Sequence, residues 1–394
     1  MHPRLVEPRA RSLAGRFPAL LILGARQVGK TTLARQAFSD LRYVDLEDPQ
    51  TAALWIESPR YHLDAHASPG VILDEVQSLP DIFPVLRGAI DADRKAMGRF
   101  ILLGSAQPTL VRQVSETLAG RVAIVELAPL TASEASGGPD PRDWRSLWLS
   151  GGFPDALSAD RRGGIFREWW EFYLRTFVER DLPALGVGAD PLLLRRLLTM
   201  LAHAQGGLAN IQRLAASLGV AHGTVTRYLD ILERTFLLRR LLPYHRNIGK
   251  RLVKSPKLYL RDTGLVHHLL NIGSHDDLEG HPIRGASWET FVIEDVIRRE
   301  MIERPHAQFY FWRTAAGAEL DLILDRGDEI HAIEVKTARA AMPGLARRVR
   351  DAAGDVGAAA VTIVDQADGE EPLAPQVSRR GFGSTVEWLP DNRR

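Results

Sequence analysis

The chain of 394 residues contains no cysteine, so it can form neither a disulfide nor a zinc–thiolate site. Such a composition fits the reducing cytoplasm. The sequence also lacks an apolar run long enough to cross a bilayer. Its first residues, Met1-His2-Pro3-Arg4, are not followed by the apolar segment of a secretory signal. We therefore expect a cytoplasmic protein with no membrane partner.

A strong excess of charge of one sign is absent as well. The chain has 50 Lys and Arg against 49 Asp and Glu, which gives a formal net charge of +1. A nucleic-acid surface, if there is one, must therefore be a local basic patch. Hydrophobic residues make up 45% of the chain, which together with its length predicts a globular protein of two or three domains.

The most specific motif joins an apolar run at 20–23 to a helical segment that starts at 31. It has the G-x-x-x-x-G-K-T spacing of a phosphate-binding loop. The residues expected to contact the nucleotide are Gly24, Ala25, Arg26, Gln27, Val28, Gly29, Lys30, Thr31 and Thr32. Glycines let the backbone approach phosphate oxygens, and the loop amides and the helix N-terminus then face the anion. We expect Lys30 to reach the β- and γ-phosphates of ATP and the Thr31 hydroxyl to ligate Mg²⁺.

Two carboxylates, Asp74 and Glu75, follow the apolar run 71–73. After a phosphate-binding loop, such a pair is typical of nucleotide hydrolysis. Asp74 would hold Mg²⁺, and Glu75 would orient or deprotonate the attacking water. For the pair taken alone, a solvated acidic strand end is the simpler alternative.

Two further candidates lie at the ends of expected strands. Ser105 follows the run 100–103, and it either contacts the γ-phosphate or its water, or caps the helix expected at 108–118. Arg121 precedes the run 122–127. It either neutralises transition-state charge at a neighbouring subunit's nucleotide or is a surface arginine favoured by the helix dipole.

Short apolar runs alternate with helical patterns through the first 135 residues, which predicts a mostly parallel sheet with helices on both faces. The expected strands are 20–23, 43–45, 71–74, 100–103 and 122–127. With the motifs above, this segment resembles the AAA+ ATPases. The resemblance implies an α/β fold with strand order 5-1-4-3-2, oligomer-dependent hydrolysis, Ser105 as the sensor and Arg121 as the arginine finger. Ser105 departs from the commoner asparagine sensor.

The segment 195–250 has the pattern of a helix-turn-helix. The expected elements are helices at 211–218 and 224–233 and a wing hairpin at 236–238 and 241–242. The second helix would offer Thr224, Thr226, Arg227 and Tyr228 to a DNA groove. Between positions 235 and 261 there are eight Lys or Arg and no Asp or Glu, a candidate electrostatic footprint for DNA. Winged helices also dock proteins, and this alternative is open.

The C-terminal part contains a D…ExK arrangement, in which twelve residues separate Asp321 from Glu334 and one residue separates Glu334 from Lys336. Strand periodicity places Glu334 and Lys336 on one face, and a hairpin can bring Asp321 beside them. Carboxylates and a carbonyl there could bind Mg²⁺, and the lysine could position a water for phosphodiester attack. Glu289 on the preceding helix is a further candidate ligand. The pattern resembles the PD-(D/E)xK nuclease fold, with leucine in place of its proline. A solvated hairpin with an ordinary ion pair is the alternative.

Along most of its length the chain resembles one family of bacterial and archaeal ATPases. The expected parts are an AAA+ nucleotide-binding domain at 1–135, a helical lid at 136–194, a winged helix at 195–250, an α/β nuclease-like domain at 251–365 and a tail at 366–394. The resemblance implies ATP and Mg²⁺ as cofactors, a homo-oligomer and DNA as a partner. An ATP-gated nuclease and a nucleotide switch that docks protein partners are the alternatives to an ATPase that acts on DNA.

Overall fold

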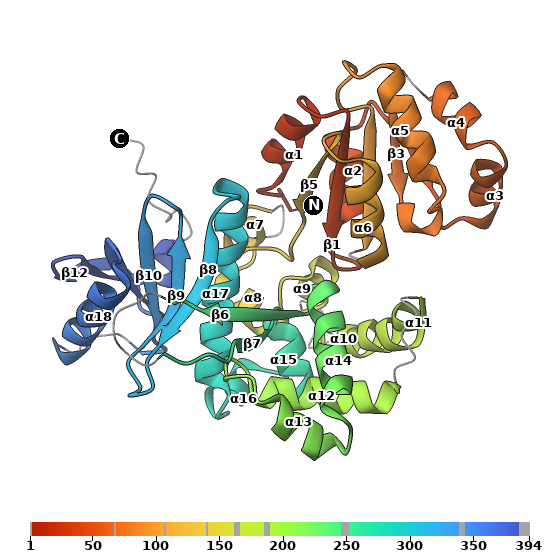
Figure 1. Ribbon diagram of the computed structural model, residues 1–394. Helices are drawn as coiled ribbons and strands as arrows, with labels where there is room; N and C mark the ends of the chain where they lie inside the picture. The colour runs from red at the N-terminus through yellow and green to blue at the C-terminus, as the bar shows by residue number, and fades with distance from the viewer. Residues whose placement is uncertain are drawn as a thin grey trace. The chain divides into compact units, whose positions relative to one another are not determined.

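The chain forms two units, which Figure 1 draws from red at the N-terminus to blue at the C-terminus. The N-terminal unit comprises Pro3–Pro129 and Arg234–Phe236, and the C-terminal unit contains the rest. The computed structural model describes residues 2–66, 68–105, 108–138, 141–160, 166–184, 190–245, 252–338 and 343–385. No helix in these ranges is both long enough and apolar enough to cross a membrane.

A five-stranded sheet forms the centre of the N-terminal unit. Its strands are β1 (Ala19–Gly24), β2 (Arg42–Asp45), β3 (Val71–Asp74), β4 (Phe100–Ser105) and β5 (Val122–Glu126). All the paired strands are parallel, in the order β2-β3-β4-β1-β5. This is the predicted order, read from the other edge. Because parallel strands end at the same edge, the residues that follow β1, β3 and β4 come together there.

Helices flank this sheet. They are α1 (Glu7–Ala14), α2 (Lys30–Ala37), α3 (Pro49–Glu57), α4 (Pro59–Ala65), the 3₁₀ turn η1 (Val76–Ser78), α5 (Ile82–Ala92) and α6 (Pro108–Thr117). In α5 the buried side chains recur at helical spacing, from Ile82 and Phe83 through Leu86 to Ile90. These side chains and those of the strands form one apolar core. The core fixes the position of the strand ends at which the nucleotide motifs lie.

An eight-stranded mixed sheet runs through the C-terminal unit in the order β12-β13-β11-β10-β9-β8-β6-β7. Its strands are β6 (Leu238–Pro243), β7 (Lys257–Leu260), β8 (Gln308–Arg313), β9 (Glu319–Asp325), β10 (Ile330–Val335), β11 (Ala360–Asp365), β12 (Glu370–Ala374) and β13 (Val377–Gly381). Strands β8, β9 and β10 form an antiparallel meander, as the D…ExK hairpin predicts.

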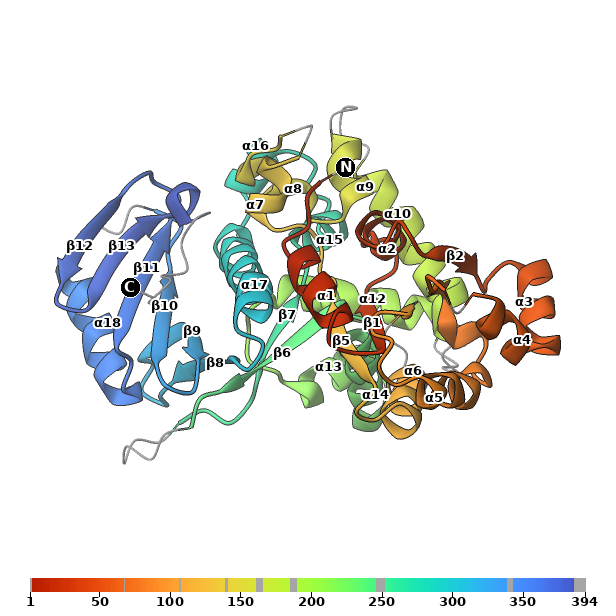
Figure 2. The same cartoon turned by 90° about the horizontal axis from the view of Figure 1, so that it is seen from above.

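The helices of this unit are α7 (Ala132–Ser136), α8 (Trp144–Ser150), α9 (Pro154–Asp160), α10 (Phe166–Thr176), the π-helical turn η2 (Phe177–Asp181), α11 (Leu182–Ala184), α12 (Pro191–His203), α13 (Ile211–Leu218), α14 (His222–Arg234), α15 (Thr263–Leu269), α16 (His275–Glu279), α17 (Arg284–Glu303), α18 (Pro343–Val356) and the 3₁₀ turn η3 (Phe382–Thr385). Helices α17 and α18 pack against strands of the sheet (Figure 2). The 20-residue α17 is buried on most sides, so its buried charged residues need partners.

Two predicted features of this unit are wrong. The expected wing hairpin at 236–238 and 241–242 is a single strand, β6, whose antiparallel partner is β7. Leu238 and Leu241, which suggested two runs, are both buried within that one strand.

The expected tail at 366–394 is also wrong for its described part, because β12 and β13 extend the sheet. The polar composition is misleading there. Arg379 points inward and donates two hydrogen bonds to buried Asp365, at 2.8 and 2.9 Å. In a sequence, a charged pair that is buried in this way cannot be distinguished from charged residues at the surface.

Candidate nucleotide site and carboxylate cluster

The phosphate-binding loop curls between β1 and α2. Gln27 (φ 58°) and Gly29 (φ 99°) both adopt left-handed backbone conformations, which turn successive amides toward one concavity. A Cβ atom on Gly24 would overlap the carbonyl oxygen of Leu127. Lys30, only 6% exposed, donates to the carbonyl oxygens of Gly24 and Ala25 at 3.2 and 3.0 Å. The loop therefore has the backbone curvature and the buried ammonium group that phosphate binding needs.

Helix α2 starts at this loop, and its N-cap residue is Gly29, which has no side chain to cap the first turn. Its second residue, Thr31, donates from Oγ1 to Asp74 Oδ2 at 2.6 Å. Asp74 is the last residue of β3 and is buried. The structure thus brings together the two residues predicted to ligate Mg²⁺, from segments 43 residues apart in the sequence.

The same Asp74 oxygen accepts a second hydrogen bond, from the hydroxyl of Tyr43, at 2.9 Å. Tyr43 lies on β2, next to β3, and the Arg35 guanidinium lies 4.9 Å from its ring centre. Burial and the Asp74 carboxylate both raise the pKa of Tyr43, so its phenol stays neutral and donates. Sequence reasoning missed Tyr43, although a polar side chain in the strand beside Asp74 was a usable signal.

Glu75 follows Asp74 in a left-handed conformation (φ 50°, ψ 46°), which is unusual for a glutamate. Its carboxylate accepts a hydrogen bond from Gln77 Nε2. Burial raises the pKa of Glu75, against the opposing influence of the Lys30 ammonium. A carboxylate with a raised pKa beside the phosphate loop suits proton abstraction from water. Gln77 is a second contact that the sequence did not indicate.

The other two strand-end candidates have different surroundings. Ser105 ends β4 and pairs with Gly24 of the adjacent strand β1, so it lies beside the first residue of the loop. Arg121, with 20% of its side chain exposed, donates to both carboxylate oxygens of Asp91. The structure therefore places Ser105 by the phosphate loop and holds Arg121 in an ion pair.

Arg4 is a further residue that sequence reasoning missed at this loop. Its Nη1 donates to the carbonyl oxygen of Val28 at 2.9 Å, and its Nη2 donates to that of Ala128. Arg4 thereby ties the loop to the chain that follows β5. No local pattern around Arg4 could have indicated these partners.

In the C-terminal unit, α13 and α14 lie where the two helices of the helix-turn-helix are expected, and Gly219 between them is left-handed (φ 68°). Of the four candidate DNA contacts, Arg227 is exposed, and Thr224 and Thr226 are partly exposed. Thr226 donates to the carbonyl of His222 in its own helix, at 3.1 Å. Tyr228 is wrong as a contact because its side chain is only 3% exposed.

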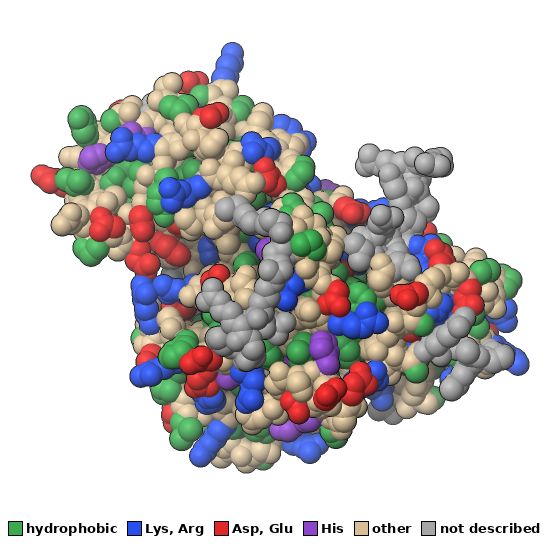
Figure 3. Space-filling model, turned by 180° about the vertical axis from the view of Figure 1, so that it is seen from behind, with side chains coloured by type: hydrophobic (Ala, Val, Ile, Leu, Met, Phe, Trp, Pro, Cys, Tyr) green, Lys and Arg blue, Asp and Glu red, His purple; other side chains and the backbone are tan. Residues whose placement is uncertain are grey.

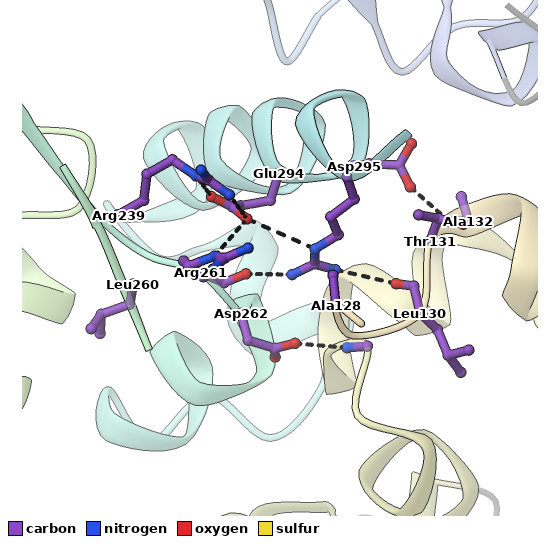
Figure 4. Close-up of polar contacts among 12 residues, drawn as sticks. Ala128, Leu130, Thr131, Ala132, Arg239, Leu260, Arg261, Asp262, Glu294 and Asp295 are labelled. Atoms are coloured by element: carbon purple, nitrogen blue, oxygen red, sulfur yellow. Dashed lines mark hydrogen bonds and ion pairs between the residues drawn. The ribbon is translucent and has the colours of Figure 1, made fainter. Parts of the chain in front are cut away.

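The predicted basic footprint between positions 235 and 261 is largely neutralised where the structure describes it. Arg240 lies 2.7 and 3.2 Å from carboxylate oxygens of Asp230 and Glu233. Arg239 and Arg261 both pair with Glu294 of α17 (Figure 4). These arginines, with Arg298, lower the pKa of buried Glu294 to about 2, although burial alone would raise it.

Three more of the eight basic residues, Arg246, Lys250 and Arg251, lie outside the described residues. On the face that Figure 3 draws, basic and acidic side chains are interspersed. The described residues of this segment therefore supply little free positive charge for nucleic acid.

Two glycine-containing segments, 151–154 and 259–265, are held together by hydrogen bonds. Asp262 is buried and accepts hydrogen bonds from the amides of Gly152 and Gly264, each at 2.9 Å. Thr263 donates to the carbonyl of Trp148 at 2.7 Å. A Cβ on Gly264 would overlap the carbonyl oxygen of Ser150. These contacts join α8, the segment after it and α15.

The D…ExK residues meet as predicted, at the hairpin of β9 and β10. Asp321 accepts from the amide of Val335 at 2.9 Å, and Lys336 donates to Glu334 at 2.6 Å. Glu289 of α17 joins them through Lys257. Burial, and then the Asp321 charge, raises the pKa of Glu334 to about 8 and that of Glu289 to about 7. In this cluster, burial and the neighbouring carboxylate of Asp321 therefore oppose the ionisation of both glutamates.

Comparison with protein families gives three matches along the chain. Residues 16–136 match an AAA domain, residues 141–276 match a domain of unknown function (DUF8612), and residues 284–377 match another domain of unknown function (DUF4143). The AAA match spans the phosphate-binding loop, Asp74 and the five-stranded sheet. With the site's geometry, it supports ATP binding and hydrolysis.

Among curated proteins, the uncharacterized protein Rv2008c of Mycobacterium tuberculosis (strain ATCC 25618 / H37Rv) is 41% identical over 373 residues, which are 94% of this chain and 81% of the relative. Mb2031c of Mycobacterium bovis matches to the same extent. The chain belongs to the family of these two mycobacterial proteins. Its members share nearly the whole chain, from the AAA domain into the region of the carboxylate cluster.

Solved structures resemble the chain more distantly. The Walker-type ATPase PABY2304 of Pyrococcus abyssi has a TM-score of 0.45 and 14% identity, over 67% of this chain and 94% of that one. DnaA from Aquifex aeolicus, solved with AMPPCP, has a TM-score of 0.32 and 15% identity, over 58% and 86%. At TM-scores below 0.5, these likenesses add nothing to the assignment.

Proposed function

We propose that this family member is a Mg²⁺-dependent ATPase whose C-terminal unit carries the effect of hydrolysis to DNA. In this proposal Lys30 binds the β- and γ-phosphates, and Thr31 and Asp74 hold Mg²⁺. Glu75 serves the attacking water, and Ser105 contacts the γ-phosphate. Arg121 acts on the nucleotide of a neighbouring subunit in a homo-oligomer.

The observation that carries the proposal is the contact between Thr31 and Asp74. One hydroxyl and one carboxylate oxygen, 2.6 Å apart beside the phosphate loop, are the protein ligands that Mg²⁺ needs in such sites, since water and phosphates supply the rest. When bound, Mg²⁺ neutralises phosphate charge. Lys30 adds a second positive charge at the same place, and its buried position makes that charge effective.

Nucleotide binding tests the site directly. Lys30→Ala should abolish binding of a fluorescent ATP analogue, because no other lysine lies in the loop. Lys95→Ala, which removes an exposed lysine of the same unit, is the matched control and should bind as the wild type does. Equal affinity of wild type and Lys30→Ala would refute the site.

Hydrolysis is tested at Glu75. Glu75→Gln keeps the shape of the side chain and removes its basicity, so it should retain ATP binding and lose turnover. If wild type and Glu75→Gln both turn over ATP at the same near-zero rate, the protein is a nucleotide switch rather than an ATPase.

DNA is proposed as the partner because the sequence of α13 and α14 has the pattern of a helix-turn-helix, and the second helix exposes Arg227. ATP turnover is measured with and without duplex DNA, and the DNA is examined for cuts. We expect DNA to raise turnover and Arg227→Ala to weaken this effect. Arg347→Ala, at an 80% exposed arginine of α18, is the charge-matched control. Turnover that is indifferent to DNA, without measurable DNA binding, would exclude this output.

A further inference from the structure

Lys257 lies at the centre of the carboxylate cluster, where the nuclease-like pattern calls for a metal ion. Its side chain is only 4% exposed. Its Nζ lies 2.7 Å from Glu319 Oε1, 3.0 Å from Glu289 Oε1 and 3.6 Å from Asp321 Oδ1. Three carboxylates from α17 and β9 thus converge on a single ammonium group.

This ammonium is fixed by the fold. Lys257 is the first residue of β7, and its backbone pairs with Leu241 of β6 and bridges to Leu208. Burial lowers the pKa of Lys257, but the carboxylates of Glu289, Asp321 and Glu319 outweigh burial and leave the pKa above its ordinary value. The group is therefore a permanent cation at neutral pH.

The carboxylate oxygens of the cluster are mostly occupied. Asp321 Oδ2 accepts from the amide of Val335 at 2.9 Å, and Glu334 Oε1 accepts from Lys336 at 2.6 Å. Glu289 Oε1 also accepts from the hydroxyl of Tyr259, at 2.6 Å. In the described part of the chain, no group of three or more His, Cys, Asp or Glu side chains is placed to hold a metal ion.

Glu334 Oε2 differs from these bonded oxygens. Glu334 Oε2 is buried and has no hydrogen-bond partner among the described residues. A single free carboxylate oxygen is a poor site for Mg²⁺, which needs six oxygens at about 2.1 Å in octahedral geometry. A divalent ion that bound both Glu334 Oε2 and Asp321 Oδ1 would also be repelled by the Lys257 ammonium. The Nζ atom of Lys257 lies only 3.6 Å from Asp321 Oδ1.

We propose that the Lys257 ammonium takes the place of the divalent metal ion in this cluster. The residues of the D…ExK pattern then hold a lysine between them instead of an ion. The C-terminal unit accordingly has no metal-dependent phosphodiester cleavage at this cluster. This inference is independent of the ATPase site, which lies in the other unit.

Mn²⁺ is the probe, because its free form gives a paramagnetic resonance signal that binding removes. The full chain is titrated with Mn²⁺ without nucleotide, as wild type, Asp321→Asn, Lys257→Met and the double variant. The phosphate loop is the same in all four, so metal bound there cancels in the comparison. Asparagine at 321 keeps an oxygen acceptor for the Val335 amide while it removes the charge.

We expect wild type and Asp321→Asn to bind Mn²⁺ equally. Lys257→Met should gain a saturable site that the added Asp321→Asn change weakens by about tenfold or more. Mn²⁺ binding to the wild type that Asp321→Asn abolishes would overturn the proposal, as would a folded Lys257→Met that gains no site. If Lys257→Met does not fold, the Mn²⁺ titration is repeated with Glu334→Gln in the wild-type background. Unchanged Mn²⁺ binding supports the proposal, and a lost site contradicts it.

Discussion

Asp91 holds Arg121 with both of its carboxylate oxygens, at 2.8 Å from Nε and 2.9 Å from Nη2. Asp91 belongs to α5 and Arg121 to the turn before β5, so the pair lies within the N-terminal unit. The guanidinium lowers the pKa of Asp91 through this hydrogen-bonded contact, so the carboxylate is charged over the whole neutral range. An arginine that is to serve a neighbouring nucleotide must first leave this partner.

Releasing Arg121 should therefore change turnover. Arg121→Ala should lower ATP turnover by about 10³-fold or more under conditions where the protein is oligomeric, the usual effect of losing an arginine finger. Asp91→Ala should raise turnover, because it frees the same guanidinium. The double variant should behave as Arg121→Ala does.

The control is Arg112→Ala, at an arginine of α6 that is 73% exposed and pairs with Glu116 of its own helix. It should leave turnover as it is. Steady-state ATP hydrolysis measured across protein concentrations provides the check. Turnover of Arg121→Ala equal to that of the wild type would leave Arg121 as a surface arginine.

The parts of the fold that sequence predicted are those encoded locally. Five short apolar runs, a glycine loop and the acidic end of one run are each read within a few residues, and AAA+ resemblance then supplies the strand order. The contact between Thr31 and Asp74 followed from that order, because both lie at one edge of the sheet.

Contacts between segments that are distant in the chain could not be predicted from the sequence. Nothing near Lys257 indicates that Glu289 and Asp321 would enclose it, and it was counted instead as part of a basic surface. Tyr228 is different, because the signal was present. It lies three residues after buried Val225 and four before buried Leu232, on the inward face of an amphipathic helix.

Tyr43 is expected to position Asp74 for Mg²⁺. Tyr43→Phe keeps the ring and its contact with Arg35 but removes the hydroxyl that orients the carboxylate. The Mg²⁺ concentration that half-activates ATP turnover should rise by about tenfold, as for other partners that orient metal ligands. Tyr61→Phe, at a 70% exposed tyrosine, should not change it. Unaltered Mg²⁺ activation in Tyr43→Phe would leave the hydroxyl a merely structural group.

Two helical glycines of the C-terminal unit provide a matched stability test. A Cβ on Gly264 would overlap the Ser150 carbonyl oxygen and lie 2.7 Å from Trp170 Nε1, whereas a Cβ on Gly285 would meet nothing within 4 Å. Gly264→Ala should therefore lower the free energy of unfolding by about 3 kcal/mol. Gly285→Ala should raise it by up to about 1 kcal/mol, since alanine favours helix. Urea denaturation measures both, and equal effects would contradict the packing described around Gly264.

Stability at acidic pH is expected to depend on His267, which is fully buried between α8 and α17. Its Nδ1 lies 2.8 Å from the carbonyl oxygen of Leu149, so this nitrogen must donate, and Nε2 then accepts from the Ser287 hydroxyl at 2.7 Å. The indole of Trp148 in turn donates to that hydroxyl at 2.9 Å. A proton on Nε2 would turn this nitrogen into a donor, so it could no longer accept the hydrogen bond from the Ser287 hydroxyl.

Burial accordingly lowers the pKa of His267 from 6.5 to about 4. Between these two values the unfolded chain binds a proton that the folded chain does not, so stability falls as the pH is lowered from 6.5 to 4 and this loss is complete below 4. The loss attributable to His267 is about 3 kcal/mol.

Urea denaturation at a series of pH values, with wild type and His267→Gln, isolates this contribution. His267→Gln is expected to be less stable at neutral pH because its contacts are imperfect, but its free energy of unfolding should fall less steeply between pH 6.5 and 4. His306→Gln, at an exposed histidine before β8, should keep the slope of the wild type. If His267→Gln and wild type lose stability in parallel, then His267 takes up a proton in the folded protein. In that case the hydrogen bonds donated from Trp148 to Ser287, from Ser287 to His267 and from His267 to Leu149 are not the native arrangement.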